Sequence, residues 1–78
     1  MPTVMTLANG KIKVSIYFKD HNPPHVHVDA PGASAVFAIK TLAIIEANGF
    51  TSKALRQIRK ALKAHQEYLM EAWNEYQG

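Results

Sequence analysis

Strict alternation of side-chain character over residues 11–18 limits the fold of this chain more than any other feature. One set is apolar and the set between is mostly polar: Ile12, Val14, Ile16 and Phe18 against Lys11, Lys13, Ser15 and Tyr17. A repeat of two is typical of a strand with one buried face. The preceding Asn9-Gly10 pair favours a type I′ turn, because both turn positions need positive φ. We therefore predict a hairpin of two strands over about residues 3–8 and 11–18.

A second hairpin is predicted over about residues 25–30 and 33–39, with Pro31-Gly32 as its turn. Pro23-Pro24 separates it from the first hairpin, because prolines cannot donate to a ladder. The expected register brings apolar residues together in both hairpins: Leu7 with Ile12, Met5 with Val14, Thr3 with Ile16, Val28 with Ala35, and Val26 with Phe37. The other face of the third strand then carries histidines and a carboxylate: His25, His27 and Asp29.

One long helix is predicted over about residues 52–76. Thr51 is a favourable N-cap, and the segment contains no internal glycine or proline. Its apolar stripe recurs every three or four residues: Leu55, Ile58, Leu62, His65, Leu69, Ala72 and Tyr76, joined by Trp73. Such a helix of about 25 residues is roughly 37 Å long, enough to cross a small sheet. Residues 41–50 fit either a short fifth strand or a helical turn, and the pattern does not choose.

These elements predict a single α+β domain over residues 1–78. It consists of an antiparallel four-stranded sheet of two hairpins, with one long C-terminal helix packed on one face. The chain has 78 residues, 47% of them hydrophobic, and no cysteine, which excludes disulfides, thiolate metal sites and cysteine nucleophiles. Its apolar runs fall far short of the ~20 residues that a membrane span needs. We therefore expect a cytoplasmic protein with no membrane partner.

One helix can cover only one face of the predicted sheet. The face that carries His25, His27 and Asp29 is therefore expected to meet solvent or a partner. If the third strand neighbours the second, the polar set of the second strand joins this face, and Tyr17 becomes a candidate binding residue. This surface is where we expect a function to lie.

The histidines permit three interpretations. His21, His25 and His27 are candidate catalytic residues, because imidazoles exchange protons near neutral pH. Alternatively His25 and His27, two residues apart on a strand, bind a divalent metal such as zinc with Asp29 or His21 as a third ligand. No cofactor is established by this pattern, because the histidines can equally be surface residues without a role. His65, at the edge of the helical stripe, is predicted to be partly buried and structural.

Charges are unevenly distributed along the predicted helix. Its first half is basic and its second half acidic: Lys53, Arg56, Arg59, Lys60 and Lys63, then Glu67, Glu71 and Glu75. In a single helix this order opposes the macrodipole, at a cost of about 0.3–1 kcal/mol for each charge. A site for phosphates or an acidic partner accounts for it, with Lys53, Arg56, Lys60 and Lys63 as binding residues, whereas a solvated face is the simpler explanation. The net charge of +3 permits either ligand.

Four segments resemble a bacterial family catalogued as domain of unknown function 4160. The specific one is the run Lys19-Asp20-His21-Asn22-Pro23-Pro24-His25-Val26-His27-Val28. The others are Met1-Pro2-Thr3-Val4, Asn48-Gly49-Phe50 and Glu71-Ala72-Trp73-Asn74-Glu75-Tyr76. Members are often encoded beside a second small protein, which implies a toxin–antitoxin-type pair. The resemblance brings no established catalytic residue, but it places His21, His25 and His27 in the family signature.

We therefore expect a small cytosolic bacterial protein that acts as a protein-interaction module for a cognate small protein, as one half of a toxin–antitoxin-type pair. The first alternative is a histidine-based RNase or phosphodiesterase that acts on RNA. The second is a metal-binding module that uses the His25-Val26-His27 strand. The sequence leaves the oligomeric state open, and a homo-oligomer is compatible with it.

Overall fold

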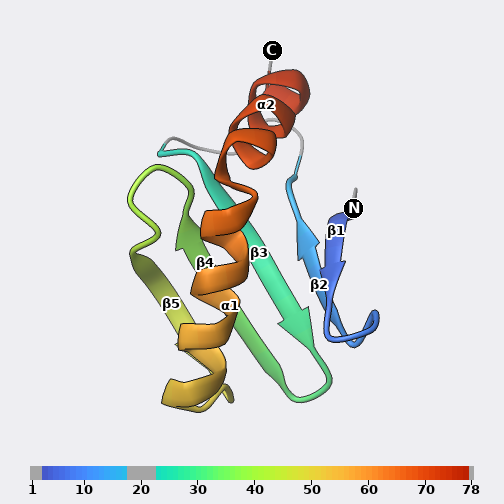
Figure 1. Cartoon of the computed structure of the whole chain (residues 1–78), viewed down its shortest axis with the longest axis vertical. Helices are drawn as coiled ribbons and strands as arrows, with labels where there is room; N and C mark the ends of the chain where they lie inside the picture. The colour runs from blue at the N-terminus through green and yellow to red at the C-terminus, as the bar shows by residue number, and fades with distance from the viewer. Residues whose placement is uncertain (1–2, 18–22, 78) are drawn as a thin grey trace.

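The fold is an antiparallel sheet in which every strand pairs with its neighbour in the chain (Figure 1). It is described from a computed structural model, which places residues 3–17 and 23–77. The strands are β1 (Thr3–Leu7), β2 (Ile12–Ser15), β3 (His25–Ala30), β4 (Ala33–Ala38) and β5 (Ile44–Asn48). Two helices follow, α1 (Ser52–Ala64) and α2 (Gln66–Gln77). The sheet order is β1-β2-β3-β4-β5.

The predicted fold of four strands and one helix is wrong in both numbers. The fifth strand, β5, pairs with β4 along the segment that the sequence left open. Phe37 lies opposite Ile44 and Val36 opposite Glu46, so Ile45 is an extra residue in the ladder. A bulge of this kind breaks the repeat of two. The sequence of β5 therefore lacks the alternation that marked β2.

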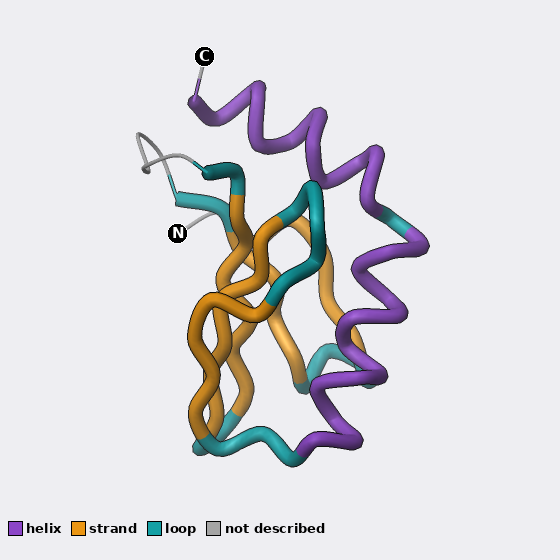
Figure 2. The backbone as a smooth tube through the Cα atoms, turned by 90° about the vertical axis from the view of Figure 1, so that its left-hand side faces the viewer, coloured by secondary structure: helices purple, strands orange, loops and turns teal. Residues whose placement is uncertain are grey.

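The predicted long helix is divided at His65. A straight helix of that length would measure about 37 Å, whereas the longest extent of the Cα trace is 33 Å. Figure 2 shows the result: α1 runs along one face of the sheet, and α2 turns across the end of the sheet. The Gln66 side chain holds the turn, because Nε2 donates to the carbonyls of Ile39 at 2.6 Å and Lys40 at 2.9 Å. His65 itself is exposed, so its predicted structural burial is also wrong.

The predicted registers are confirmed except at the start of β1. All the expected pairs in the second hairpin are found, as are Leu7 with Ile12 and Met5 with Val14. Thr3, however, pairs with Ser15 instead of Ile16, because Val4 is bulged out of the ladder. The Tyr68 hydroxyl donates to the Val4 carbonyl at 2.8 Å. The bulge therefore gives α2 an attachment point on β1.

The core lies between the apolar face of the sheet and the two helices. Its fully buried side chains come from the three central strands, from the residues just after β2 and β4, and from both helices: Val14, Ile16, Val26, Val28, Phe37, Ile39, Leu62 and Leu69. Trp73 is 4% exposed, which confirms its predicted packing role. Some strand ends differ from prediction. β2 ends at Ser15, which leaves Tyr17 beyond the strand, and Phe18 lies outside the described residues.

Two glycines with nearly equal positive φ angles allow the cost of backbone strain to be measured apart from the cost of crowding. Gly49 has φ +84° and Gly10 has φ +88°. A Cβ on Gly49 would overlap the Gly32 carbonyl oxygen and lie 3.0 Å from the Ala33 Cα, whereas one on Gly10 would meet nothing within 4 Å. Gly10→Ala should cost about 1–2 kcal/mol of unfolding free energy, and Gly49→Ala about 1–3 kcal/mol more. Urea unfolding measures both. Equal losses of unfolding free energy would contradict the close approach of the Gly49 turn to the Gly32 turn.

The turn between the helices should depend on the Gln66 amide. Gln66→Leu removes both donors and leaves two carbonyls without them, which should lower the unfolding free energy by about 1–3 kcal/mol. Asn74→Leu on α2 is the control, because Asn74 is an exposed amide residue, and it should change stability by less than about 0.5 kcal/mol. Chemical denaturation compares the two variants. Similar stabilities would show that this side chain does not hold the turn.

Candidate functional site

Four aromatic rings are in contact at the end of the sheet nearest α2. The Tyr17 and His27 rings stack with centroids 4.0 Å apart and an interplanar angle of 15°. His27 meets His25 edge to face at 5.1 Å, and His25 lies 5.2 Å from Trp73 of α2. The two histidines share a face because they are two residues apart on β3. Tyr17 reaches them because Ser15 of β2 lies opposite His27. We call these four residues the ring row.

The orientation of His25 is set by its own backbone. Its Nδ1 lies 2.8 Å from the Pro23 carbonyl oxygen. A carbonyl can only accept, so Nδ1 carries the hydrogen, and the neutral ring then carries its lone pair on Nε2. That nitrogen is the one through which His25 could take up a proton, accept a hydrogen bond or bind a metal.

The face that carries the ring row is less open than the sequence predicted. Lys13, opposite Asp29, is exposed as expected. At the other end of the face, however, His25 and His27 are half-buried, and Ser15 is 3% exposed. Trp73 contributes to this cover, because the bend at His65 brings α2 to the end of the sheet. This face was predicted to meet solvent or a partner, and its histidine end is instead partly covered within the chain itself.

Metal binding depends on whether a third ligand joins the two histidines. Asp29 shares their face but lies four residues from His25, roughly 13 Å along an extended strand. Among the residues that the structure describes, no group of three His, Asp or Glu side chains could hold a metal ion. His21 lies outside the described residues, so its predicted role as a ligand or catalyst stays a prediction. The candidate ligand sets made up only of described residues therefore do not meet at one metal position.

A second feature, the basic groove, lies between α1 and the turn that precedes β5. Its lining comes from the turn, α1 and the start of α2: Lys40, Thr41, Leu42, Arg56, Arg59, Lys60, Lys63 and Gln66. The predicted binding residues Arg56, Lys60 and Lys63 are thus brought together. Lys53 does not line the groove, and Tyr17 belongs to the ring row. Lys40 was missed, because only the pairing of β4 with β5 carries it to α1.

The cations of the groove have no acidic neighbour on their own helix. The α1 sequence contains five basic residues and neither Asp nor Glu. The groove residues Arg56, Arg59, Lys60 and Lys63 are exposed, as is Lys40. Side chains three and four residues apart lie on one side of a helix, so their positive charge is concentrated along the groove. An anionic group is the ligand that this arrangement favours.

The two edges of the sheet differ. At one edge the bulged Val4 of β1 is bonded to Tyr68. At the other edge all five residues of β5 are exposed. They include Ile44, 46% exposed, and Ile45, 54% exposed, two of the three large hydrophobic side chains that are exposed among the described residues. β5 is therefore the more accessible edge.

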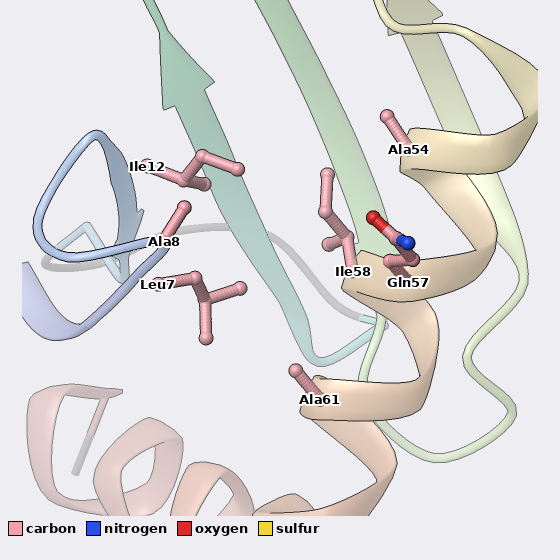
Figure 3. Close-up of a pocket in the computed structure, with 7 residues that line it drawn as sticks. All are labelled: Leu7, Ala8, Ile12, Ala54, Gln57, Ile58 and Ala61. Carbon is pink, nitrogen blue, oxygen red and sulfur yellow. The ribbon is translucent and has the colours of Figure 1, made fainter.

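A shallow apolar cleft separates the first hairpin from α1. Figure 3 shows side chains from the two elements facing one another across it. The lining is Leu7, Ala8 and Ile12 on one side and Ala54, Gln57, Ile58 and Ala61 on the other. It contains one amide and no ionisable group. This cleft offers packing surface but no groups for acid–base or metal chemistry.

Together these features define a small α+β domain with an antiparallel five-stranded sheet, two helices, an accessible edge strand and a basic groove. The family model of DUF4160, a domain of unknown function, matches residues 12–74. The chain therefore belongs to this family, which confirms the resemblance inferred from its motifs. No curated protein and no solved structure matches the chain. Within residues 3–17 and 23–77, neither helix has the length and apolar character needed to span a membrane.

The contact between Tyr17 and His27 can be measured with a double-mutant cycle. Their stacking predicts a coupling free energy of about 0.5–1.5 kcal/mol between Tyr17→Ala and His27→Ala. Tyr68→Ala replaces a tyrosine that bonds to β1, and its coupling to His27→Ala should be near zero. Urea unfolding of the single and double variants supplies both values. Equal couplings would show that the ring row does not form in solution.

Proposed function

We propose that this protein is an interaction module that adds an extended segment of a second protein to the outer edge of β5. The observation that carries the proposal is that every residue of this edge strand, from Ile44 to Asn48, is exposed. An edge strand presents backbone donors and acceptors that a second strand can pair with. Ile44 and Ile45 add exposed apolar surface at the same place. Backbone pairing would supply affinity, and side-chain contacts would supply specificity.

The contrast with β1 supports β5 as the binding edge. Proteins commonly protect edge strands with bulges, charges or covering segments. β1 has a bulge at Val4, and α2 contacts that residue through Tyr68. β5 also has a bulge, but its residues are exposed throughout. A partner is therefore favoured at β5.

The charge of the molecule favours a different protein over a second copy of this chain. The net charge is +3, and Lys40 of the basic groove lies four residues before the start of β5. Pairing two β5 edges would bring two such grooves near one another, and like charges disfavour that contact. The homo-oligomer is therefore an outcome that the experiment below distinguishes.

The family suggests which partner to test first. Its members are often encoded beside a second small protein, and the toxin–antitoxin-type pair inferred from that arrangement needs two chains that bind. The proposed edge pairing provides such a contact. Which chain would be the toxin does not follow from the fold.

The proposal is tested by co-expressing the tagged chain with the small protein encoded beside it. We expect a one-to-one complex in which the amide hydrogens of β5 exchange more slowly than in the isolated chain, because a new strand covers them. The amides of β1 should be unaffected. A complex that leaves β5 exchange unchanged, or a dimer of this chain alone, would contradict the proposal.

A pair of edge variants makes the test specific. Ile44→Lys/Ile45→Lys places two lysines on the proposed binding edge, a substitution typical of protected edges. It should weaken the complex at least about tenfold, or 1.4 kcal/mol. Thr3→Lys/Thr6→Lys adds the same charge to exposed positions of β1 and should leave affinity within about twofold. Isothermal titration calorimetry compares them, and equal losses would argue against β5.

Histidine-based RNA cleavage stays the alternative. The 5.1 Å contact between His25 and His27 would suit proton exchange with a substrate. Against this, His25 packs against the buried Trp73. We therefore place the function at β5.

A further inference from the structure

We infer that the basic groove makes this module selective for acidic partners: the segment that pairs with β5 carries a cluster of carboxylates beside the Ile44 end of that strand. This inference rests on the proposed function and specifies the chemistry of the ligand. Edge pairing alone gives no role to the five cations of the groove, and this inference assigns them one: Lys40, Arg56, Arg59, Lys60 and Lys63.

The first argument is the concentration of like charge. Five cations from two parts of the chain line one groove. Four of them come from α1, which contains no acidic residue that could neutralise them. Like charges at helical neighbour positions are mutually destabilising. An anionic ligand would remove this repulsion on binding, so the charge of the groove favours the complex over the isolated chain.

The second argument is continuity between the groove and the edge strand. Leu42 lines the groove, and β5 begins two residues later at Ile44. Ala38 fixes the turn between them, because its amide donates to the Ala43 carbonyl and its carbonyl accepts from the Leu42 amide, each at 2.9 Å. The five residues of β5 span roughly 16 Å. A segment that pairs with them and continues past Ile44 would therefore reach the groove.

The third argument separates an acidic polypeptide from a nucleic acid. Proteins that hold single strands of nucleic acid stack the bases on aromatic side chains, and none of the residues that line the groove is aromatic. The amide nitrogen of Gln66, which could read a base edge, already donates to Ile39 and Lys40. Only a polypeptide can use the groove and the β5 backbone together. Carboxylates also match the fork of an arginine side chain.

The experiment compares designed peptides on the full chain. Each fluorescent peptide has a central six-residue stretch of alternating threonine and valine. One carries three glutamates on either side, and its twin carries glutamines, so that both strand directions are sampled. At about 50 mM salt we expect the glutamate peptide to bind at least about tenfold more tightly, and the difference to shrink at about 500 mM salt.

Charge-matched variants locate the effect. Arg56→Gln/Lys60→Gln/Lys63→Gln neutralises three groove cations and should reduce the glutamate preference to less than about threefold. Lys11→Gln/Lys13→Gln/Lys53→Gln removes the same charge from residues outside the groove and should preserve the preference. Ile44→Lys/Ile45→Lys should weaken both peptides, although it adds positive charge. Amide exchange of β5 reports strand pairing in each complex.

The outcomes separate the two proposals. If both peptides protect β5 with equal affinity, edge pairing stands and acidic selectivity is overturned. If neither peptide protects β5 and the neighbour-encoded protein also leaves it unchanged, the proposed function fails. If a ten-nucleotide single-stranded RNA binds more tightly than the glutamate peptide and loses affinity in the groove variant, the groove is a nucleic-acid site and the inference is overturned. Equal losses in the two charge-matched variants would also overturn it, because the preference would then reflect net charge.

Discussion

The bend between the two helices determines where α2 lies and which parts of the sheet the helices leave uncovered. Its anchor is the Gln66 amide, which donates to two carbonyls just after β4. With this turn in place, α1 covers the apolar face and α2 crosses the end of the sheet (Figure 2). A straight helix of the same number of residues would be longer than the longest extent of the molecule. In that case Tyr68 would not reach Val4, and Trp73 would not reach His25. The contacts of Tyr68 with Val4 and of Trp73 with His25 are made by the helix that this turn redirects.

The same bend makes the two edges of the sheet unequal. Because α2 turns towards β1, its Tyr68 hydroxyl bonds to the bulged Val4 there. Among the residues that the structure describes, no further helix lies at the opposite side, where β5 is exposed along its whole length. α1 contributes its cations to the groove near that side. The accessible backbone and the positive charge thus gather around β5, whereas the conspicuous histidines lie at the end that α2 covers. That separation is why we place binding at β5 and not at the histidine motif.

Local signals predicted the parts of the fold that are determined locally. The Asn9-Gly10 turn and the alternation around Val14 were sufficient for the first hairpin and most of its register. The bulges at Val4 and Ile45 were not predictable, because each depends on which strand lies alongside. The helix break had no glycine or proline to mark it, and the Gln66 contacts that hold it are with Ile39 and Lys40, which are distant in the sequence. For the site, the adjacency of His25 and His27 followed from strand geometry, but the contact with Trp73 and the position of Lys40 are long-range consequences of the fold.

Dividing the helix also changes the meaning of its charge order. In one continuous helix, basic residues before acidic ones oppose the macrodipole throughout. In two helices, Lys63 lies in the last turn of α1 and Glu67 in the first turn of α2, and both positions are favourable. Helix electrostatics thus account for these two charges, but not for Lys53 or Arg56 near the start of α1, where a cation is unfavourable. Arg56 lines the basic groove, where the proposed anionic ligand would account for a cation that helix electrostatics disfavours.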